Sequence, residues 1–91
     1  MRIRHDETAH RFIGETPSGT AVLAYTPHGK DVLDLYSTYV PPAERGRGLG
    51  GQLVKAAVAF AREKGLRIIP TCWYVAGWIG AHPEHGDLVE R

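Results

Sequence analysis

The stretch Val40–Gly51, which reads VPPAERGRGLGG, divides this 91-residue chain into two parts with different periodicity. Its two consecutive prolines cannot donate the hydrogen bonds of a strand ladder, so they end whatever strand precedes them. From Leu49 onward, apolar residues recur at helical spacing as far as Lys64, and Gly65 suits the position that follows a helix. We therefore expect a sheet before the stretch and a helix, residues 49–64, after it.

The residues before this stretch form short strand-forming runs separated by turns. We expect strands at residues 3–5, 11–15, 20–26 and 31–40, and turns at residues 16–19 and 27–30. Short turns join antiparallel strands, so these runs predict an antiparallel meander. Alternation along the last strand predicts that Val32, Asp34, Tyr36 and Thr38 share one face, and that Leu33, Leu35, Ser37 and Tyr39 share the other.

The residues after the long helix predict one more strand and one more helix. Residues 67–72 (RIIPTC) are strand-forming, and Pro70 leaves one side of that strand unpaired. Residues 73–82 predict a second helix, which Pro83 ends, and residues 84–91 predict a short, solvated acidic tail. The fold class is therefore α+β, or mixed α/β around one sheet, in a single domain that spans residues 1–91.

The overall composition is that of an ordinary globular domain, with 43% hydrophobic and 23% charged residues. It excludes a disordered chain, which would hold fewer apolar residues, and a membrane-spanning helix, which needs an apolar run of about 18 residues. The net charge is only +1, but residues 41–67 hold six basic and two acidic side chains. Positive charge therefore gathers in the middle of the chain, where it favours an anionic ligand.

The cysteine and histidine residues bear on compartment and metal binding. Cys72 is the only cysteine, which excludes an internal disulfide and a cysteine-rich zinc site. His82 and His85 match no standard zinc spacing with Cys72, so we expect no metal. The N-terminal residues lack an apolar signal region, which predicts a cytoplasmic protein with no membrane partner.

Trp73 and Trp78 are expected in the core or at a subunit contact, because no basic residues alternate with them as in a nucleic-acid platform.

The glycine-rich segment Arg45–Gly51 is the strongest candidate for a ligand site. Four of its residues are glycines, so successive main-chain N–H groups can approach one anion closely. The helix dipole adds to this attraction, and the guanidinium groups of Arg45 and Arg47 suit phosphate geometry. The chain lacks the Lys-Ser or Lys-Thr pair of a P-loop and the parallel βαβ unit of a dinucleotide fold. We expect a pyrophosphate here; the alternative is a flexible glycine turn with solvated arginines.

Together, these segments resemble the GNAT superfamily of N-acetyltransferases, and in particular its small single-domain proteins with a Cys-x-Tyr element after the penultimate strand. The stretches that carry the resemblance are Val40–Pro42, Arg45–Gly50, Leu53–Ala57, Pro70–Val75 and His82–Pro83. The resemblance implies a minimal GNAT-like fold in which a strand meander is followed by helix, strand and helix. It also implies a V-shaped splay in the sheet between the strands before and after the first helix.

The resemblance implies that acetyl-CoA binds at this splay. Main-chain groups near Tyr39 and Val40 would pair with the pantetheine arm as if it were a strand. The amides of Arg45, Gly46, Arg47, Gly48, Leu49, Gly50 and Gly51 would hold the pyrophosphate. The acetyl group would pass to a primary amine, whose class (small amine, polyamine, lysine or protein N-terminus) the sequence leaves open.

Cys72 and Tyr74 are the catalytic candidates that the resemblance implies. Cys72 lies where a strand meets a helix, a position that increases the thiolate character of a thiol. It could carry the acyl group or relay a proton, and Tyr74 could protonate the CoA thiolate; the alternative is that Cys72 is a small buried hydrophobe. The similar proteins usually carry His-Thr-Glu-Val where this chain has Ser37–Val40, so the imidazole and the carboxylate of a base are missing. Asp34, Glu44 or a water chain could take their place.

Three functions follow, in decreasing order of support. The first is an N-acetyltransferase that uses acetyl-CoA. The second is a CoA- or acyl-CoA-binding module without turnover, which the departures at Ser37 and Tyr39 favour. The third is a small interaction protein whose glycine loop contacts the phosphates of RNA, which only the basic middle segment supports.

Overall fold

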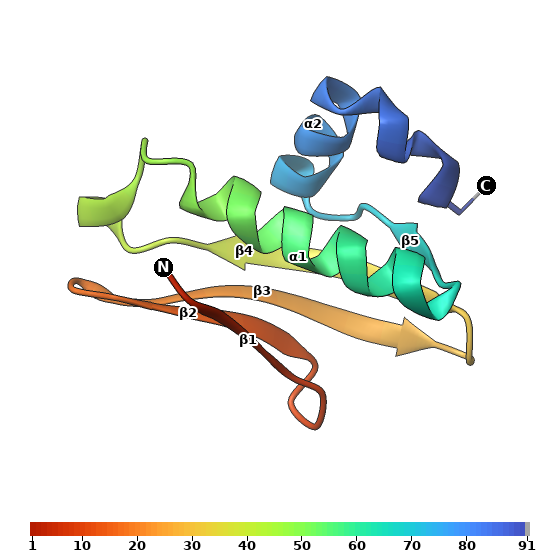
Figure 1. The fold of residues 1–91 in the computed structure, drawn as a ribbon, viewed down its shortest axis with the longest axis horizontal. Helices are drawn as coiled ribbons and strands as arrows, with labels where there is room; N and C mark the ends of the chain where they lie inside the picture. Colours follow the sequence, from red (N-terminus) through yellow and green to blue (C-terminus); the bar gives the residue numbers. More distant parts are fainter. Residues whose placement is uncertain (91) are drawn as a thin grey trace.

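Five strands form one mixed sheet in the order β1-β2-β3-β4-β5 in a computed structural model, which describes residues 1–90. The strands are β1 (Ile3–Asp6), β2 (Arg11–Thr16), β3 (Gly19–His28), β4 (Val32–Tyr39) and β5 (Arg67–Ile69). The helices are α1 (Leu49–Lys64), α2 (Trp73–Ala81) and the short 3-10 helices η1 (Pro42–Glu44) and η2 (Pro83–Leu88). α1 lies along one face of the sheet, and α2 lies beside it near β5 (Figure 1). The predicted order of meander, helix, strand and helix is confirmed.

Helix α1 begins and ends at the residues that the periodicity predicts. Gly65 follows it with a φ of +69°, a left-handed conformation that suits a residue without a side chain. The Gly65 N–H donates to the carbonyls of Ala61 and Arg62, which would otherwise lack a partner at the helix end. The face of α1 that meets the sheet consists of small and branched apolar residues, namely Leu53, Val54, Ala57, Val58 and Ala61.

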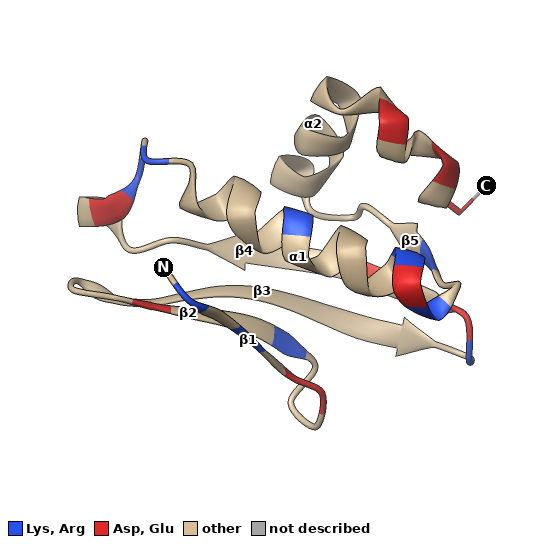
Figure 2. Cartoon of the chain, in the orientation of Figure 1, with Lys and Arg blue, Asp and Glu red and all other residues tan. Residues whose placement is uncertain are grey.

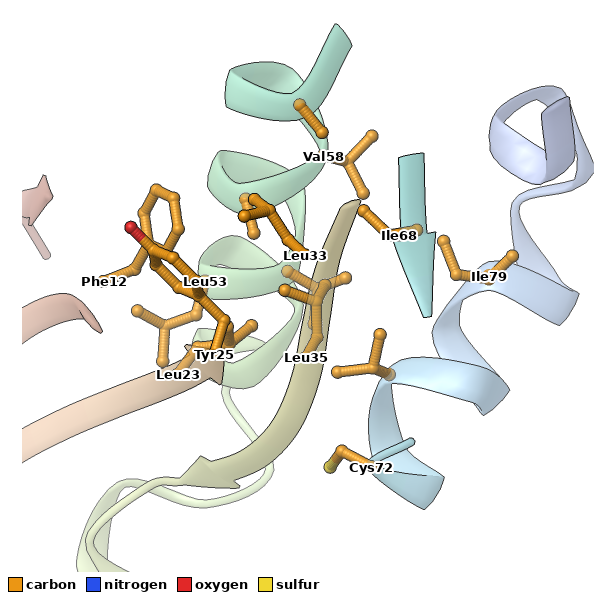
Figure 3. Packing of buried hydrophobic residues seen from close by; sticks show 14 of the residues in the cluster. Phe12, Leu23, Tyr25, Leu33, Leu35, Leu53, Val58, Ile68, Cys72 and Ile79 are labelled. Carbon is orange, nitrogen blue, oxygen red and sulfur yellow. The ribbon is translucent and has the colours of Figure 1, made fainter. Parts of the chain in front are cut away.

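The core lies between α1 and the covered face of the sheet, where Figure 3 shows its side chains meeting. Leu23 of β3, Leu35 of β4, Ile68 of β5 and Val75 of α2 are all fully buried. Burying one such side chain contributes about 1.5–3 kcal/mol. These four residues and the buried face of α1 belong to one core, which fixes β3, β4, β5 and both helices relative to one another.

A β-bulge in β4 changes which of its side chains face the core. The pairing of β3 with β4 shifts between Ala24 and Tyr25, which leaves Tyr36 as an extra residue in β4. Beyond the bulge, Thr38 pairs with the buried Leu23, and cross-strand partners share a face. The strict alternation expected over residues 31–40 is therefore wrong, because one extra residue moves Thr38 from the outer face to the core face.

Two strand boundaries also differ from the predictions. β3 continues through Pro27 and His28, which pair with Leu33 and Val32, so the turn is tighter than residues 27–30. Gly29 makes this possible with a φ of +64°. β5 ends at Ile69 rather than at residue 72, because the next residue is a proline that cannot continue the ladder.

The prediction of a solvated tail after Pro83 is wrong. Residues 83–88 form η2, Leu88 is buried, and the Glu90 N–H donates to the Ile68 carbonyl at 2.8 Å. Asp87 accepts two hydrogen bonds from the Arg62 guanidinium, at 2.9 and 3.1 Å. The segment therefore covers the outer edge of β5, which protects that edge from pairing with another chain.

Helix α2 follows the prediction for residues 73–82, with Cys72 before it and His82 as its C-cap. It carries no charged residue, and Figure 2 shows it without a blue or red band. Its nine residues are far fewer than a bilayer requires. None of the helices within residues 1–90 is both long enough and apolar enough to cross a membrane.

Candidate functional site

Strands β4 and β5 separate part of the way along their length. They pair only between Val32–Asp34 and Arg67–Ile69. One further link follows, where the Cys72 N–H donates to the Leu35 carbonyl at 2.9 Å. Beyond Leu35, β4 continues to Tyr39. Within residues 1–90, β3 is the one strand that pairs with this part of β4. The sheet is therefore closed at one end of the β4–β5 pair and open at the other.

A cavity of about 550 Å³ lies at the open end. Its walls come from the end of β4, the loop before α1, the first turn of α1 and the start of α2. The lining residues are Thr38, Val40, Glu44, Arg45, Gly46, Gly48, Leu49, Gly50, Cys72, Trp73 and Tyr74. The volume is in the range of small-molecule sites. The fold thus brings most of the glycine-rich loop and both catalytic candidates to one cavity.

Two glycines give the loop a bare and open backbone. Gly46 and Gly48 have φ angles of +83° and +78°, which other residues rarely adopt. A Cβ at either position would meet nothing within 4 Å, so both face open space. Gly48 is also the N-cap of α1, whose first N–H groups have no partner within the helix. Such a backbone can turn several N–H groups toward one anion.

The two loop arginines have different surroundings. Arg45 lines the cavity, and its Nε donates to the Val40 carbonyl at 2.9 Å while its guanidinium lies 5.8 Å from the centre of the Tyr39 ring. Arg45 therefore ties the loop to the end of β4. Arg47 is not among the lining residues; its Nη1 lies 3.7 Å from a carboxylate oxygen of Glu44.

Glu44, one of the proposed replacements for a base, is buried in a way that the sequence does not indicate. Only 7% of its surface is exposed, and it accepts a hydrogen bond from the Ser18 hydroxyl at 2.9 Å. Ser18 lies in the turn between β2 and β3, so the partner comes from 26 positions away. A charged residue beside two arginines has the pattern of a solvated loop, and only the folded sheet brings the buried partner.

Gly50 and Gly51 allow two helices to pack closely, a role that the loop prediction did not include. A Cβ on Gly50 would lie 2.9 Å from the Tyr74 hydroxyl, and a Cβ on Gly51 would lie 3.2 Å from the Trp78 indole nitrogen. Contacts this short require the neighbours to move. The two glycines therefore let α2 approach the first turn of α1. Gly51 does not line the cavity, whereas Gly50 does.

Cys72 lies at the N-terminus of α2, with its Sγ 3.6 Å from the Thr38 hydroxyl oxygen. Burial acts to raise the pKa of this thiol, but its hydrogen bonds with the main chain at Val75 and Tyr74 and with Thr38 outweigh that effect. The pKa of Cys72 is therefore lower than that of an ordinary cysteine. Thr38 reaches the sulfur only because of the bulge in β4.

The remaining candidates lie at different places around the opening. Val40 and Leu49 line the cavity, whereas Tyr39 is half exposed and lies outside it. Asp34 also lies outside the cavity; one of its oxygens is buried without a hydrogen-bond partner, and the other is 3.7 Å from His28. Of the proposed replacements for a base, only Glu44 therefore reaches the cavity wall.

Trp73 lines the cavity with 83% of its surface exposed, so it does not lie in the core, and the alternative expectation of a subunit contact stays a prediction. As the first residue of α2 it projects away from the core, while Val75 and Ile79 form the buried side of the helix. Trp78 is half-buried and packs against the core cluster, in line with its prediction. Within residues 1–90, no group of three or more His, Cys, Asp or Glu side chains is arranged to hold a metal ion.

Comparisons with known proteins bear on the family. Residues 11–88 match the family model described as GCN5-related N-acetyl-transferase. Protein NATD1 from Bos taurus is 39% identical to the chain over 85 residues, and Protein NATD1 from Homo sapiens is 38% identical over the same length. Each match covers 91% of the chain and 75% of the relative. Protein NATD1 from Danio rerio is 37% identical over 93 residues, covering 100% of the chain and 84% of that protein.

A solved structure has the same fold. The NMR solution structure of a GCN5-like protein from Staphylococcus aureus superposes with a TM-score of 0.72 at 22% sequence identity. The match covers 98% of this chain and 87% of that one.

Proposed function

The chain belongs to the GCN5-related N-acetyltransferase family, and from that membership we propose that it transfers an acetyl group from acetyl-CoA to a primary amine. Family membership supports an acetyltransferase in general; the donor, the acceptor class and the acting residues are our proposal. The observation that carries it is the cavity at the open end of the sheet, which combines a glycine-rich loop with a thiol and a phenol.

The loop fits the diphosphate of the donor. The open left-handed backbone at Gly46 and Gly48 and the first amides of α1 offer N–H groups to its oxygens. Arg45 adds a positive charge at the cavity wall. The pantetheine arm would then lie along the unpaired edge of β4 near Val40, and the thioester would face Thr38 and Cys72.

The residues near the thioester have the chemistry for acyl transfer. The donor supplies the acetyl carbonyl; a C–N bond forms at that carbon, the C–S bond breaks, and the amine proton must leave. A main-chain N–H near Val40 would stabilise the developing oxyanion, and the Tyr74 hydroxyl would protonate the departing thiolate. Glu44 is the carboxylate at the cavity wall that could take the amine proton.

Cys72 has two proposed roles that one measurement separates. Its lowered pKa gives it thiolate character, so it either accepts the acetyl group transiently or relays a proton. Incubation with acetyl-CoA and no amine, followed by mass spectrometry, should reveal an acetylated Cys72 in the first case only. Cys72→Ala should abolish that adduct, and Cys72→Ser tests whether a hydroxyl can replace the thiol as a proton relay.

A matched pair of glycine variants tests the proposed donor site. Gly46→Asp and Gly29→Asp each place a carboxylate at a left-handed position that faces open space, but only Gly46 lines the cavity. The two variants should lose similar stability. We expect calorimetry to show CoA binding weakened about thirtyfold or more for Gly46→Asp, because a charge close to a diphosphate repels it by about 2–4 kcal/mol. Unchanged binding in Gly29→Asp is the control, and equal binding in both variants would refute the site.

A CoA-binding module without turnover is the second candidate. The resemblance implies a histidine and a glutamate where this chain has Ser37 and Tyr39, and Tyr39 lies outside the cavity, which favours this candidate. Release of free CoA, measured with a panel of amines, distinguishes the two. Release with at least one amine supports the enzyme, and tight CoA binding without release from any amine supports the module.

A further inference from the structure

The carboxylate of Asp34 in β4 is incompletely balanced by the rest of the chain. Leu33 and Leu35, on either side of it, lie among the buried core side chains of Figure 3, so Asp34 points to the opposite face of the sheet. One of its oxygens is enclosed without a hydrogen-bond partner, and no other enclosed side-chain oxygen or nitrogen of residues 1–90 is in that state. An enclosed oxygen without a donor is costly, so it favours a positive charge nearby.

No lysine or arginine supplies that charge. Within residues 1–90, none lies within ion-pair distance of Asp34, whose other oxygen is 3.7 Å from a ring nitrogen of His28. Arg67 on the neighbouring strand β5 donates instead to Glu90, at 3.1 Å. The Asp34 side chain is 21% exposed, so a cation from solution can reach the carboxylate.

An uncharged path leads from Asp34 to the open end of the sheet. On the way, β4 carries the exposed residues Tyr36 and Ser37. Thr38 follows, and it lines the cavity together with Cys72. Asp34 and Thr38 pair with residues three positions apart on β3, so they are separated by about 10 Å along the sheet. Asp34 thus lies one extended alkyl chain away from the proposed position of the thioester.

The amine has to approach the thioester from the face that carries Asp34. The proposed donor would occupy the cavity, which the loop before α1 and the first turns of both helices line on the other face. On the Asp34 face, the exposure of Tyr36, Ser37 and Tyr39 leaves this end of β4 open to solvent. Because β4 does not pair with β5 beyond this point, an amine can lie along β4 and pass its unpaired edge to the thioester.

We propose that Asp34 selects acceptor amines that carry a second positive charge about 10 Å from the reacting nitrogen. This inference rests on the proposed function, because the amine must meet a bound thioester. The second ammonium pairs with the Asp34 carboxylate, the alkyl chain crosses the exposed Tyr36 ring, and the first amine reaches the thioester beside Thr38. The chemical class is therefore a linear diamine. Asp34 does not touch the reacting atoms; it determines which amine is bound.

Three acceptors test the proposal in the parent protein. Octane-1,8-diamine carries a second ammonium at a suitable separation, 8-aminooctan-1-ol replaces that ammonium with a hydroxyl, and propane-1,3-diamine is too short to reach Asp34. Mass spectrometry of the acetylated products gives kcat/KM for each. After correction for its two equivalent amines, the long diamine should exceed the other two about fivefold through a lower KM, as one partly exposed ion pair would produce.

A matched pair of aspartate variants assigns the preference to one carboxylate. Asp34→Asn keeps the shape of the side chain and removes its charge, so the ratio of the long diamine to the amino alcohol should fall to about one. Asp31→Asn removes an exposed carboxylate just before β4, on the side of Asp34 away from the opening, and should keep the ratio of the parent. Added salt should lower the ratio in the parent, because it screens the ion pair.

The outcomes separate this inference from the proposed function. Equal kcat/KM for the long diamine and the amino alcohol in the parent would overturn the inference, and this comparison does not depend on how well a variant folds. A preference that persists in Asp34→Asn would also overturn it. In both cases acetylation of the amines would leave the proposed function standing. If the parent acetylates none of the three amines while it binds CoA, the proposed transfer fails and this inference fails with it.

Discussion

Strands β4 and β5 pair at one end of their length and separate at the other. At the closed end, Val32–Asp34 pair with Arg67–Ile69, and the neighbouring Leu35 and Ile68 are fully buried. At the open end, no strand of residues 1–90 pairs with β4 on that side, and the space holds a cavity lined by polar and apolar side chains and by glycine backbone. Two features separate the ends: a proline after β5 and a bulge within β4.

The closed end of this small fold holds the stabilising core, and the open end holds the cavity with its thiol and phenol. Unpaired main-chain groups cost stability, and the part of β4 that does not pair with β5 lies at the open end. The closed end offsets that cost through side chains contributed by several elements. Variants should therefore affect stability at one end and ligand binding at the other, and the predictions below test that division.

The largest expected effect compares two residues on one face of β4. Leu35→Ala, at the closed end, should lower the free energy of unfolding by about 3 kcal/mol, because it leaves a cavity in the core. Thr38→Ala, at the open end, should cost less than about 1 kcal/mol. Urea unfolding followed by circular dichroism measures both. Similar losses in the two variants would mean that the open end is part of the stabilising core.

The next effect concerns glycines that serve packing rather than ligand binding. Gly50→Ala should destabilise the protein by about 1–3 kcal/mol, because its methyl group would press on the Tyr74 ring. Gly77→Ala has free space and should be neutral or stabilising by up to about 1 kcal/mol. Thermal unfolding of both variants provides the comparison. If Gly50→Ala is as stable as Gly77→Ala, α1 and α2 do not approach each other this closely.

A smaller effect depends on pH at the sheet edge farthest from the opening. Burial lowers the pKa of His5, which stacks on Phe12 and bonds the Tyr25 hydroxyl. The unfolded chain therefore binds a proton at a higher pH than the folded protein does, so stability rises with pH in this range. We expect stability to fall as the pH drops from about 7 through the ordinary histidine pKa of 6.5. His5→Gln should flatten this fall, and an unchanged slope would exclude His5 as its source.

The smallest effect is a change in thiol reactivity at the open end. Because hydrogen bonds lower the pKa of Cys72, its alkylation rate should reach a plateau at a lower pH than that of a free cysteine. Thr38→Val removes one of those hydrogen bonds and should move the midpoint upward. Iodoacetamide labelling followed by mass spectrometry gives both profiles. A midpoint that is the same in Thr38→Val and the parent would contradict the contact across the opening.

Features that local sequence signals determine were predictable. The limits of α1 follow from its apolar spacing and from Gly65, and the bare loop follows from its glycines. The resemblance to a known family added the splay between β4 and β5, which spacing alone does not specify. These features depend on residues that are neighbours in the chain, so the sequence displays them directly.

Features that depend on distant partners were not predictable. The bulge at Tyr36 has no marker in the sequence, yet it places Thr38 beside Cys72. Glu44 is buried only because the β2–β3 turn brings Ser18 to it. Leu88 is buried because η2 folds back onto β5, although its acidic neighbours suggest a solvated tail. In each case the deciding contact joins segments more than ten positions apart.

The most direct test of the division between the two ends is an NMR titration of the ¹⁵N-labelled protein with CoA. We expect the largest amide shifts at residues 38–40, 46–50 and 72–78, which surround the open end. We expect small shifts at Val32–Asp34 and Arg67–Ile69, where the same strands are paired. Shifts concentrated at the paired end, or no shifts at millimolar CoA, would rule out a CoA site at the open end.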